Sequence, residues 1–302
     1  MEGGTSQGTS GERTDAPVPR ALLGLLGHPI RHSASPAMHE AAAAAAGIDA
    51  RYHLIELDGA DRATLAQALE GVRRLGFAGV NVTFPYKEAV VGLLDALSPE
   101  AFAVGAVNTV VVDHGRLVGH NTDFTGFRAA LTRTIGPLDP RPVAVIGAGG
   151  VGKAAAFALA DIGAPALHLY DRVPAQAERL AAALGARVAC RVCDSVEAAL
   201  AKAGGLVNGT PIGMLPNTDS PVPARLLRND LWVADAVYWP LLTPLLRAAQ
   251  AAGARVMSGR ELAIDQAVDA FRLFLEREPA RDTMASAFDR ALAQRAARAA
   301  DR

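Results

Sequence analysis

The residues best suited to move a proton are Lys87 and Asp123, and we predict both at turns rather than on helix faces. The segment Asn81–Lys87 is predicted to run from a strand into a helix beginning near Lys87, and the positive end of a helix makes a lysine lose its proton more readily. Brought together, this amine and carboxylate would form an acid–base pair for an alcohol proton, which must leave as the carbon loses a hydride. The alternatives are a solvated surface lysine and a carboxylate that only faces a helix N-terminus.

Ser33 and Ser35 precede a helix that we predict over Pro36–Ala46. Two hydroxyls beside a helix N-terminus can bind a carboxylate, and the helix dipole adds to the attraction. In the alternative interpretation Ser35 only caps the helix, with Pro36 at its first position.

A glycine-rich turn connects a predicted strand over Pro142–Ile146 to a predicted helix over Gly150–Ile162. This turn matches G-x-G-x-x-G and reads Gly147, Ala148, Gly149, Gly150, Val151 and Gly152. Such glycines permit a tight turn and let backbone N–H groups approach a pyrophosphate at the helix N-terminus. The strand–turn–helix context makes the motif specific for a dinucleotide, against the alternative of a glycine-rich turn without a ligand.

The next predicted strand, Ala166–Tyr170, is followed by Asp171 and Arg172. A carboxylate here can accept hydrogen bonds from both ribose hydroxyls of NAD and would repel the 2′-phosphate of NADP. The repulsion is about 4 kcal/mol for unit charges about 4 Å apart at an effective dielectric of about 20. Arg172 could instead bind that phosphate or stack on adenine, and Asp171 could be only a helix cap. We favour NAD, with NADP as the alternative.

These sites require a chain of alternating strands and alanine-rich helices. Besides the elements above, we predict strands over 21–27, 50–57, 79–83, 187–192, 206–208 and 231–237, a hairpin over 107–119 around His114-Gly115, and helices over 62–75, 122–135, 176–184, 196–203, 241–252, 261–276 and 281–300. Repeated strand–helix units predict an α/β fold with parallel strands and helices on both faces of the sheet.

The composition excludes several classes of function. Thirty basic and thirty-one acidic residues nearly cancel, which argues against a nucleic-acid partner or a membrane surface as the target. No apolar run is long enough to span a membrane, and residues 1–19 resemble a disordered tail without the apolar core of a secretory signal, so we expect a cytosolic protein. Cys190 and Cys193 lack a second ligand pair, so we interpret them as ordinary thiols and expect no metal site.

Taken together, the motifs from about Leu22 to Pro279 resemble the shikimate dehydrogenase family. The matching segments are His32–Pro36, Asn81–Lys87, Gly105–Thr109, Asn121–Asp123, the glycine-rich turn, Asn208–Met214, Asp235–Leu246, and Gly259 with the helix of Gln266. Asp171, the His120–Asp123 turn and the Gln266–Phe274 segment are most similar to the NAD-preferring quinate/shikimate dehydrogenases, whereas the serine pair is of the shikimate type.

The resemblance implies two α/β lobes around a cleft: a substrate-binding lobe of residues 20–122 and 258–302, and a Rossmann-type NAD(P)-binding lobe of residues 123–257. It implies that Lys87 is the acid/base paired with Asp123, and that Ser33 and Ser35 hold the substrate carboxylate. The remaining implied substrate-binding residues are Thr83, Asn108, Tyr238 and Gln266, and those implied along the nicotinamide are Thr210, Ala236 and Gly259.

The implied activity is reversible NAD(P)-dependent oxidation of a ring secondary alcohol, shikimate to 3-dehydroshikimate, with quinate as a further substrate. The alternatives are an NADP-dependent biosynthetic enzyme, an aminoshikimate-pathway variant, and a non-catalytic dinucleotide or metabolite sensor. A sensor could do without the acid–base pair, which this chain keeps. We expect a small-molecule substrate and allow a homodimer.

Overall fold

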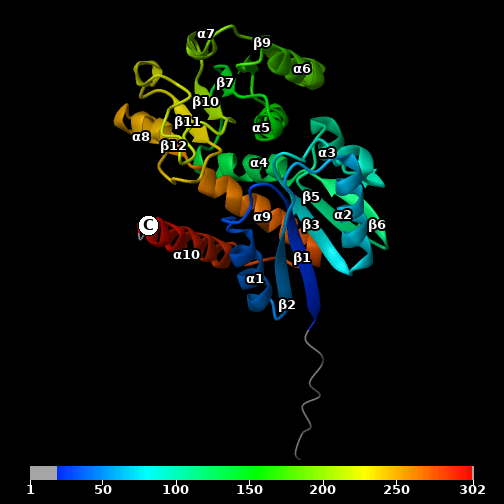
Figure 1. Cartoon of the computed structure of the whole chain (residues 1–302). Helices are drawn as coiled ribbons and strands as arrows, with labels where there is room; N and C mark the ends of the chain where they lie inside the picture. Colours follow the sequence, from blue (N-terminus) through cyan, green and yellow to red (C-terminus); the bar gives the residue numbers. More distant parts are fainter. Residues whose placement is uncertain (1–18, 301–302) are drawn as a thin grey trace, which may run out of the picture.

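The computed structural model describes residues 19–300, so the tail predicted over residues 1–19 lies outside the described residues apart from Pro19. Two α/β lobes, each built on a six-stranded sheet, are joined by two long helices that cross between them (Figure 1). None of the helices in the described part of the chain is long and apolar enough to cross a membrane.

The first sheet lies in the N-terminal lobe and has the strand order β2-β1-β3-β5-β6-β4. Its strands are β1 (Arg20–Gly27), β2 (Asp49–Glu56), β3 (Phe77–Val82), β4 (Ala96–Leu97), β5 (Thr109–Asp113) and β6 (Arg116–His120). The nearly continuous apolar run of β1 fits its parallel pairing with β2 and β3 on both sides. The predicted hairpin is confirmed, because β5 and β6 are antiparallel around His114 and Gly115, which both have positive φ.

The second sheet is parallel throughout, with the order β12-β11-β10-β7-β8-β9. Its strands are β7 (Val143–Ile146), β8 (Ala166–Tyr170), β9 (Ala189–Val192), β10 (Gly205–Asn208), β11 (Trp232–Asp235) and β12 (Arg255–Met257). Read outward from β7 in chain order, this is the doubly wound arrangement of dinucleotide-binding folds, whose order reverses between β7 and β10. Ligands of such sheets bind beyond the carboxyl ends of the strands at that reversal.

The helices are α1 (Ser35–Ala45), α2 (Arg62–Arg74), α3 (Pro99–Val104), α4 (Thr122–Thr134), α5 (Gly150–Asp161), α6 (Pro174–Leu184), α7 (Val196–Leu200), α8 (Pro244–Ala251), α9 (Gly259–Leu275) and α10 (Arg281–Ala300). The helix predicted from Lys87 is wrong: turns follow β3, and only a short 3-10 helix forms at Val91–Leu93. Sequence reasoning also missed β4, α3 and β12, which are short. Helix α8 begins three residues later than the predicted range of 241–252. The cause is local, since the Thr243 hydroxyl caps the helix by accepting from the Leu246 amide and Pro244 takes the first helical position.

Helices α4 and α9 pack closely beneath the cleft, and Gly126 makes this approach possible. A Cβ atom at Gly126 would lie 2.5 Å from the backbone nitrogen of Gln266. The missing side chain therefore sets the spacing of the two helices, which carry Asp123 and Gln266 toward the same space.

Candidate active site

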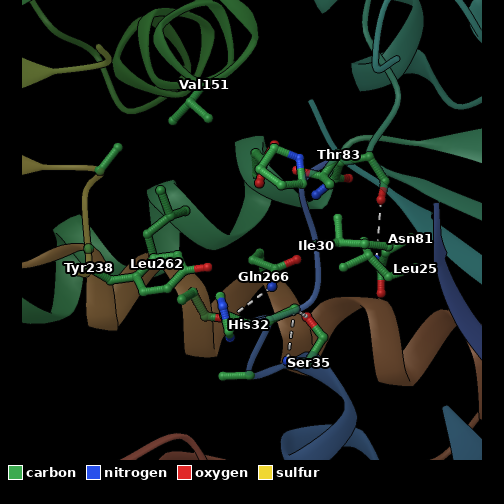
Figure 2. Close-up of a pocket in the computed structure, with 18 of the residues that line it drawn as sticks. Leu25, Ile30, His32, Ser35, Asn81, Thr83, Val151, Tyr238, Leu262 and Gln266 are labelled. Atoms are coloured by element: carbon green, nitrogen blue, oxygen red, sulfur yellow. Dashed lines mark hydrogen bonds between the residues drawn. The ribbon is translucent and has the colours of Figure 1, made fainter. Parts of the chain in front are cut away.

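A cleft of about 600 Å³ lies between the lobes. All eight predicted catalytic and substrate-binding residues line it: Ser33, Ser35, Thr83, Lys87, Asn108, Asp123, Tyr238 and Gln266. Figure 2 shows Ser35, Thr83, Tyr238 and Gln266 around this space, with Val151 of α5 facing it from the dinucleotide lobe. Of the three residues predicted along the nicotinamide, Ala236 and Gly259 also border the cleft, whereas Thr210 is not among its lining residues.

Lys87 and Asp123 form the central polar contact of the cleft. Lys87 Nζ donates to Asp123 Oδ2 at 2.6 Å, and the side chains are only 16% and 9% exposed. Asp123 is held by the start of α4, where the Asn121 side chain caps the helix by accepting from the Phe124 amide. No helix begins at Lys87, so the predicted placement of this lysine at the start of a helix is wrong, and its direct partner is the Asp123 carboxylate.

The serine hydroxyls lie together at the start of α1. Ser33 Oγ donates to Ser35 Oγ at 3.1 Å and accepts from the Ser35 amide at 3.2 Å. The alternative in which Ser35 caps the helix is wrong, because Ser35 is already helical and Ala34 holds the cap position without a side-chain hydrogen bond. Both hydroxyls border the cleft at a helix N-terminus, the placement that suits a carboxylate.

A buried amide network forms one wall of the cleft. Asn108 accepts from the Thr122 amide at 2.6 Å and donates to the Thr122 hydroxyl at 2.9 Å. Asn81, which sequence reasoning quoted in a motif without assigning it a role, donates to Thr109 Oγ1 at 2.9 Å and accepts from the Tyr52 hydroxyl at 2.7 Å. The signal for Asn81 was its place at the carboxyl end of an apolar strand. This network fixes the amides that face the cleft.

Gln266 of α9 and Tyr238 of the segment after β11 both line the cleft (Figure 2). Gln266 Nε2 donates to the Ala263 carbonyl at 2.9 Å, which fixes the side-chain amide along α9. The Tyr238 ring packs edge-on against Phe288 at 5.5 Å, and burial raises the pKa of its hydroxyl. Tyr238 is therefore a neutral hydrogen-bonding group.

The glycine-rich turn has the geometry of a phosphate cradle. Gly147 has φ +94°, and a Cβ at Gly152 would lie 1.9 Å from the Gly147 carbonyl oxygen, so both positions require glycine. A Cβ at Gly149 would meet nothing within 4 Å, which leaves the space before α5 open. The N-terminus of α5 has no side-chain cap, so its N–H groups are available to an anion. These residues fit a dinucleotide.

Asp171 lies directly against this turn. Its Oδ2 accepts from the Ala148 amide at 2.8 Å and its Oδ1 accepts from the Val173 amide at 2.8 Å. Asp171 thus ties the glycine-rich turn to the segment entering α6, whose cap position is Val173 rather than Asp171. Arg172 is exposed and belongs to the same segment.

Thr210 and Ala236 follow just after the carboxyl ends of β10 and β11. Asp235 is fully buried and accepts from Asn208 at 2.9 Å and from Thr243 at 2.6 Å, while burial raises its pKa to about 6. Thr210 donates to Asn208 Oδ1 at 2.7 Å. This network of hydrogen bonds orients the loops that follow β10 and β11.

The two cysteines lie away from the cleft. Cys190 is half-buried on β9 and Cys193 is buried just after it, and burial raises the pKa of both thiols.

Comparison with known proteins identifies the family. Residues 25–110 match the shikimate dehydrogenase substrate binding domain. A shikimate dehydrogenase (NADP⁺) of Streptomyces avermitilis is 44% identical over 265 residues, which cover 85% of this chain and 91% of that enzyme. A quinate/shikimate dehydrogenase (NAD⁺) of Corynebacterium efficiens is 42% identical over 88% of this chain and 97% of its own length. This chain belongs to the shikimate dehydrogenase family.

Solved structures of the family have the same fold. The quinate dehydrogenase of Corynebacterium glutamicum in complex with NAD superposes with a TM-score of 0.83 at 39% identity, over 89% of this chain and 99% of that one. The shikimate 5-dehydrogenase of Thermus thermophilus in complex with NADP(H) and shikimate superposes with a TM-score of 0.81 at 39% identity, over 90% and 99% of the two chains. The predicted two-lobed α/β fold is therefore confirmed.

Proposed function

We propose that this protein catalyses the reversible NAD(P)-dependent oxidation of the ring secondary alcohol of shikimate, with quinate as the second candidate substrate. The observation that carries the proposal is the buried contact between Lys87 and Asp123, placed between a serine pair at a helix N-terminus and a dinucleotide cradle. Close relatives that act on shikimate and on quinate/shikimate support both substrates.

In the proposed reaction Lys87 Nζ exchanges the proton of the substrate hydroxyl. Bound nicotinamide would take up or give back the hydride. Asp123 holds the amine in place through the 2.6 Å contact and balances its charge when protonated. Since both groups are largely withdrawn from water, the proton passes between the substrate oxygen and one fixed partner.

The remaining residues would bind and orient the substrate. Ser33 and Ser35 would hold its carboxylate, while Thr83, Asn108, Tyr238 and Gln266 would contact its hydroxyls or line the site. Their shared position on the cleft supports this assignment.

We propose NAD as the favoured cofactor and NADP as the alternative. Gly147–Val151 would hold the pyrophosphate, and Thr210, Ala236 and Gly259 would border the nicotinamide. Asp171 lies against the glycine-rich turn, where its charge would repel a 2′-phosphate, and Arg172 would stack on adenine or reach solvent. The catalytic efficiency should favour NAD by at least about tenfold, which corresponds to about 1.4 kcal/mol.

The test is a set of initial rates on shikimate and on quinate, each with NAD and with NADP, for the wild type, Lys87→Ala and the control Lys202→Ala. Loss of a general acid/base should lower turnover at least about 100-fold in Lys87→Ala. Lys202 is exposed and remote in sequence, so its variant should match the wild type. A Lys87→Ala enzyme that keeps more than about a third of wild-type turnover would remove the proposed acid/base.

We further propose that residues 20–122 and 258–302 form the substrate-binding domain and residues 123–257 the dinucleotide domain. The two sheets support this division, and α9 packs against α4 as well as against the first sheet. A cytosolic location and a homodimer stay predictions. Light scattering on the purified protein measures the oligomeric state.

A further inference from the structure

Arg295 of the C-terminal helix α10 borders the cleft without a carboxylate partner. Two other basic residues on the cleft, Lys87 and Arg31, are paired with Asp123 and Glu56 at 2.6 Å and 2.7 Å. No carboxylate among the side chains described for residues 19–298 lies within 4.0 Å of Arg295. Its positive charge is therefore not neutralised by a neighbour within this part of the chain.

The packing of α10 directs Arg295 toward the cleft. Phe288, Leu292 and Arg295 follow one another at helical spacings of four and three residues, so they share one face of α10. Phe288 and Leu292 are buried in the core cluster that contains Ala34 and Met38, beside the serine pair. That core holds the middle of α10 against α1.

Trp239 and Tyr238 fix the position of the guanidinium. Arg295 Cζ lies 4.3 Å from the centroid of the Trp239 ring, a close cation–π contact. The adjacent Tyr238 lines the cleft and is near enough for the charge of Arg295 to oppose part of the rise in its pKa. A guanidinium over an aromatic ring keeps N–H groups available to an anion.

We propose that Arg295 is a specificity-determining residue that attracts the carboxylate of the substrate to the Ser33–Ser35 end of the cleft. The inference rests on the proposed function, because it requires an anionic substrate. The serines supply neutral hydroxyls, whereas Arg295 supplies the net charge that distinguishes an acid from an uncharged analogue of the same shape.

The attraction has a defined kinetic signature. The carboxylate keeps its charge throughout the reaction, so Arg295 stabilises the bound substrate and the transition state equally and acts on KM rather than on kcat. Attraction between partly exposed charges is screened by salt, so its effect decreases as the ionic strength rises.

The experiment compares Arg295→Gln with Arg298→Gln, which removes the same charge from an exposed position on the same helix. At low ionic strength Arg295→Gln should raise KM for shikimate about fivefold, with kcat within about twofold of the wild type. The increase should shrink in high salt and should be absent for the uncharged methyl ester of shikimate. Arg295→Lys keeps the positive charge, so its KM should lie close to that of the wild type. Arg298→Gln should behave as the wild type. Thermal melting of each variant checks folding.

Three outcomes would overturn the inference. The first is an unchanged KM in Arg295→Gln. The second is an equal loss for the acid and its ester, which would show that Arg295 only supports the wall through Trp239. The third is failure of Arg295→Lys to restore KM. A wild-type enzyme inactive on both shikimate and quinate would instead overturn the proposed function, and this inference with it.

Discussion

His39 provides a test of the packing behind the substrate site. It lies on α1, is fully buried, and stacks on Tyr52 at 4.9 Å. Within the described residues neither ring nitrogen has a hydrogen-bond partner, and burial lowers its pKa to about 3. The folded protein therefore holds His39 neutral, whereas the unfolded chain takes up a proton near the ordinary value of about 6.5.

This difference makes folding sensitive to acid. Between about pH 6.5 and 3 the unfolded state binds more protons at this position, so the free energy of unfolding falls as the pH falls. From pH 8 to pH 5 the loss from His39 is about 2 kcal/mol, because one proton binds at an unfolded pKa about 1.5 units above pH 5. Asp235, whose pKa is raised to about 6, acts in the opposite direction.

The perturbation is His39→Phe, which keeps a stacked ring and removes the titration. Urea unfolding of the wild type and the variant at pH 8 and pH 5 gives the change in each free energy of unfolding. The variant should lose about 2 kcal/mol less than the wild type over this range, and contributions from Asp235 and other groups cancel in the comparison. His53→Phe, at an exposed position on β2, is the control and should keep the wild-type pH dependence. If His39→Phe and the wild type change by the same amount within about 0.5 kcal/mol, His39 is not held neutral by burial.

Three further variants test separate parts of the molecule. Ser33→Ala combined with Ser35→Ala should mainly raise KM, since two charge-assisted hydrogen bonds of about 1.5–3 kcal/mol each would be lost, and an unchanged KM for shikimate would assign the hydroxyls only to the turn. Asp171→Asn should narrow the preference for NAD by improving the use of NADP. If the ratio of initial rates with NAD and NADP is unchanged, the role of the carboxylate is only to bind the backbone amides of Ala148 and Val173. Gly126→Ala should destabilise the protein by about 1–3 kcal/mol, because its Cβ would meet the α9 backbone at 2.5 Å. The control Gly71→Ala, with nothing within 4 Å, should be neutral or stabilising in thermal melting, and equal stability of the two alanine variants would contradict the close approach.

Sequence reasoning succeeded where the signal is local. The dinucleotide-binding turn could be predicted because its glycines lie in one short segment. Gly147 has a positive φ and Gly152 has no room for a Cβ, so neither position accepts a side chain. The elements around it, β7 and α5, were predicted within one residue at each end. The helix predicted from Lys87 was wrong because the local sequence of Asn81–Lys87 resembles a helix start but a distant segment decides the backbone there. The Lys87 carbonyl accepts a hydrogen bond from the Val107 amide at 2.8 Å, so it is not free to pair within a helix.

Contacts between distant segments could not be read from the sequence. Tyr52 reaches Asn81 only because β2 and β3 flank β1 in the first sheet. Arg295 reaches the cleft only because α10 folds back onto α1. Neither residue belongs to a motif with a spacing rule, so a single sequence gives no reason to choose it over other tyrosines and arginines.

The contact between Lys87 and Asp123 is the strongest argument that the cleft serves chemistry rather than stability. Removing two charges from water costs several kcal/mol for each ion, and the mutual attraction rarely returns more than that, so apolar side chains of similar size would stabilise this position better. The chain nevertheless places both groups at less than one fifth exposure, on segments separated by 36 residues. Elsewhere Asp265, also buried, is shared by Arg133 and Arg281, so three helices are tied together by its charge. The Lys87–Asp123 contact ties the turn after β3 only to α4 and faces an open cleft, which is the arrangement expected of groups that exchange a proton with a bound molecule.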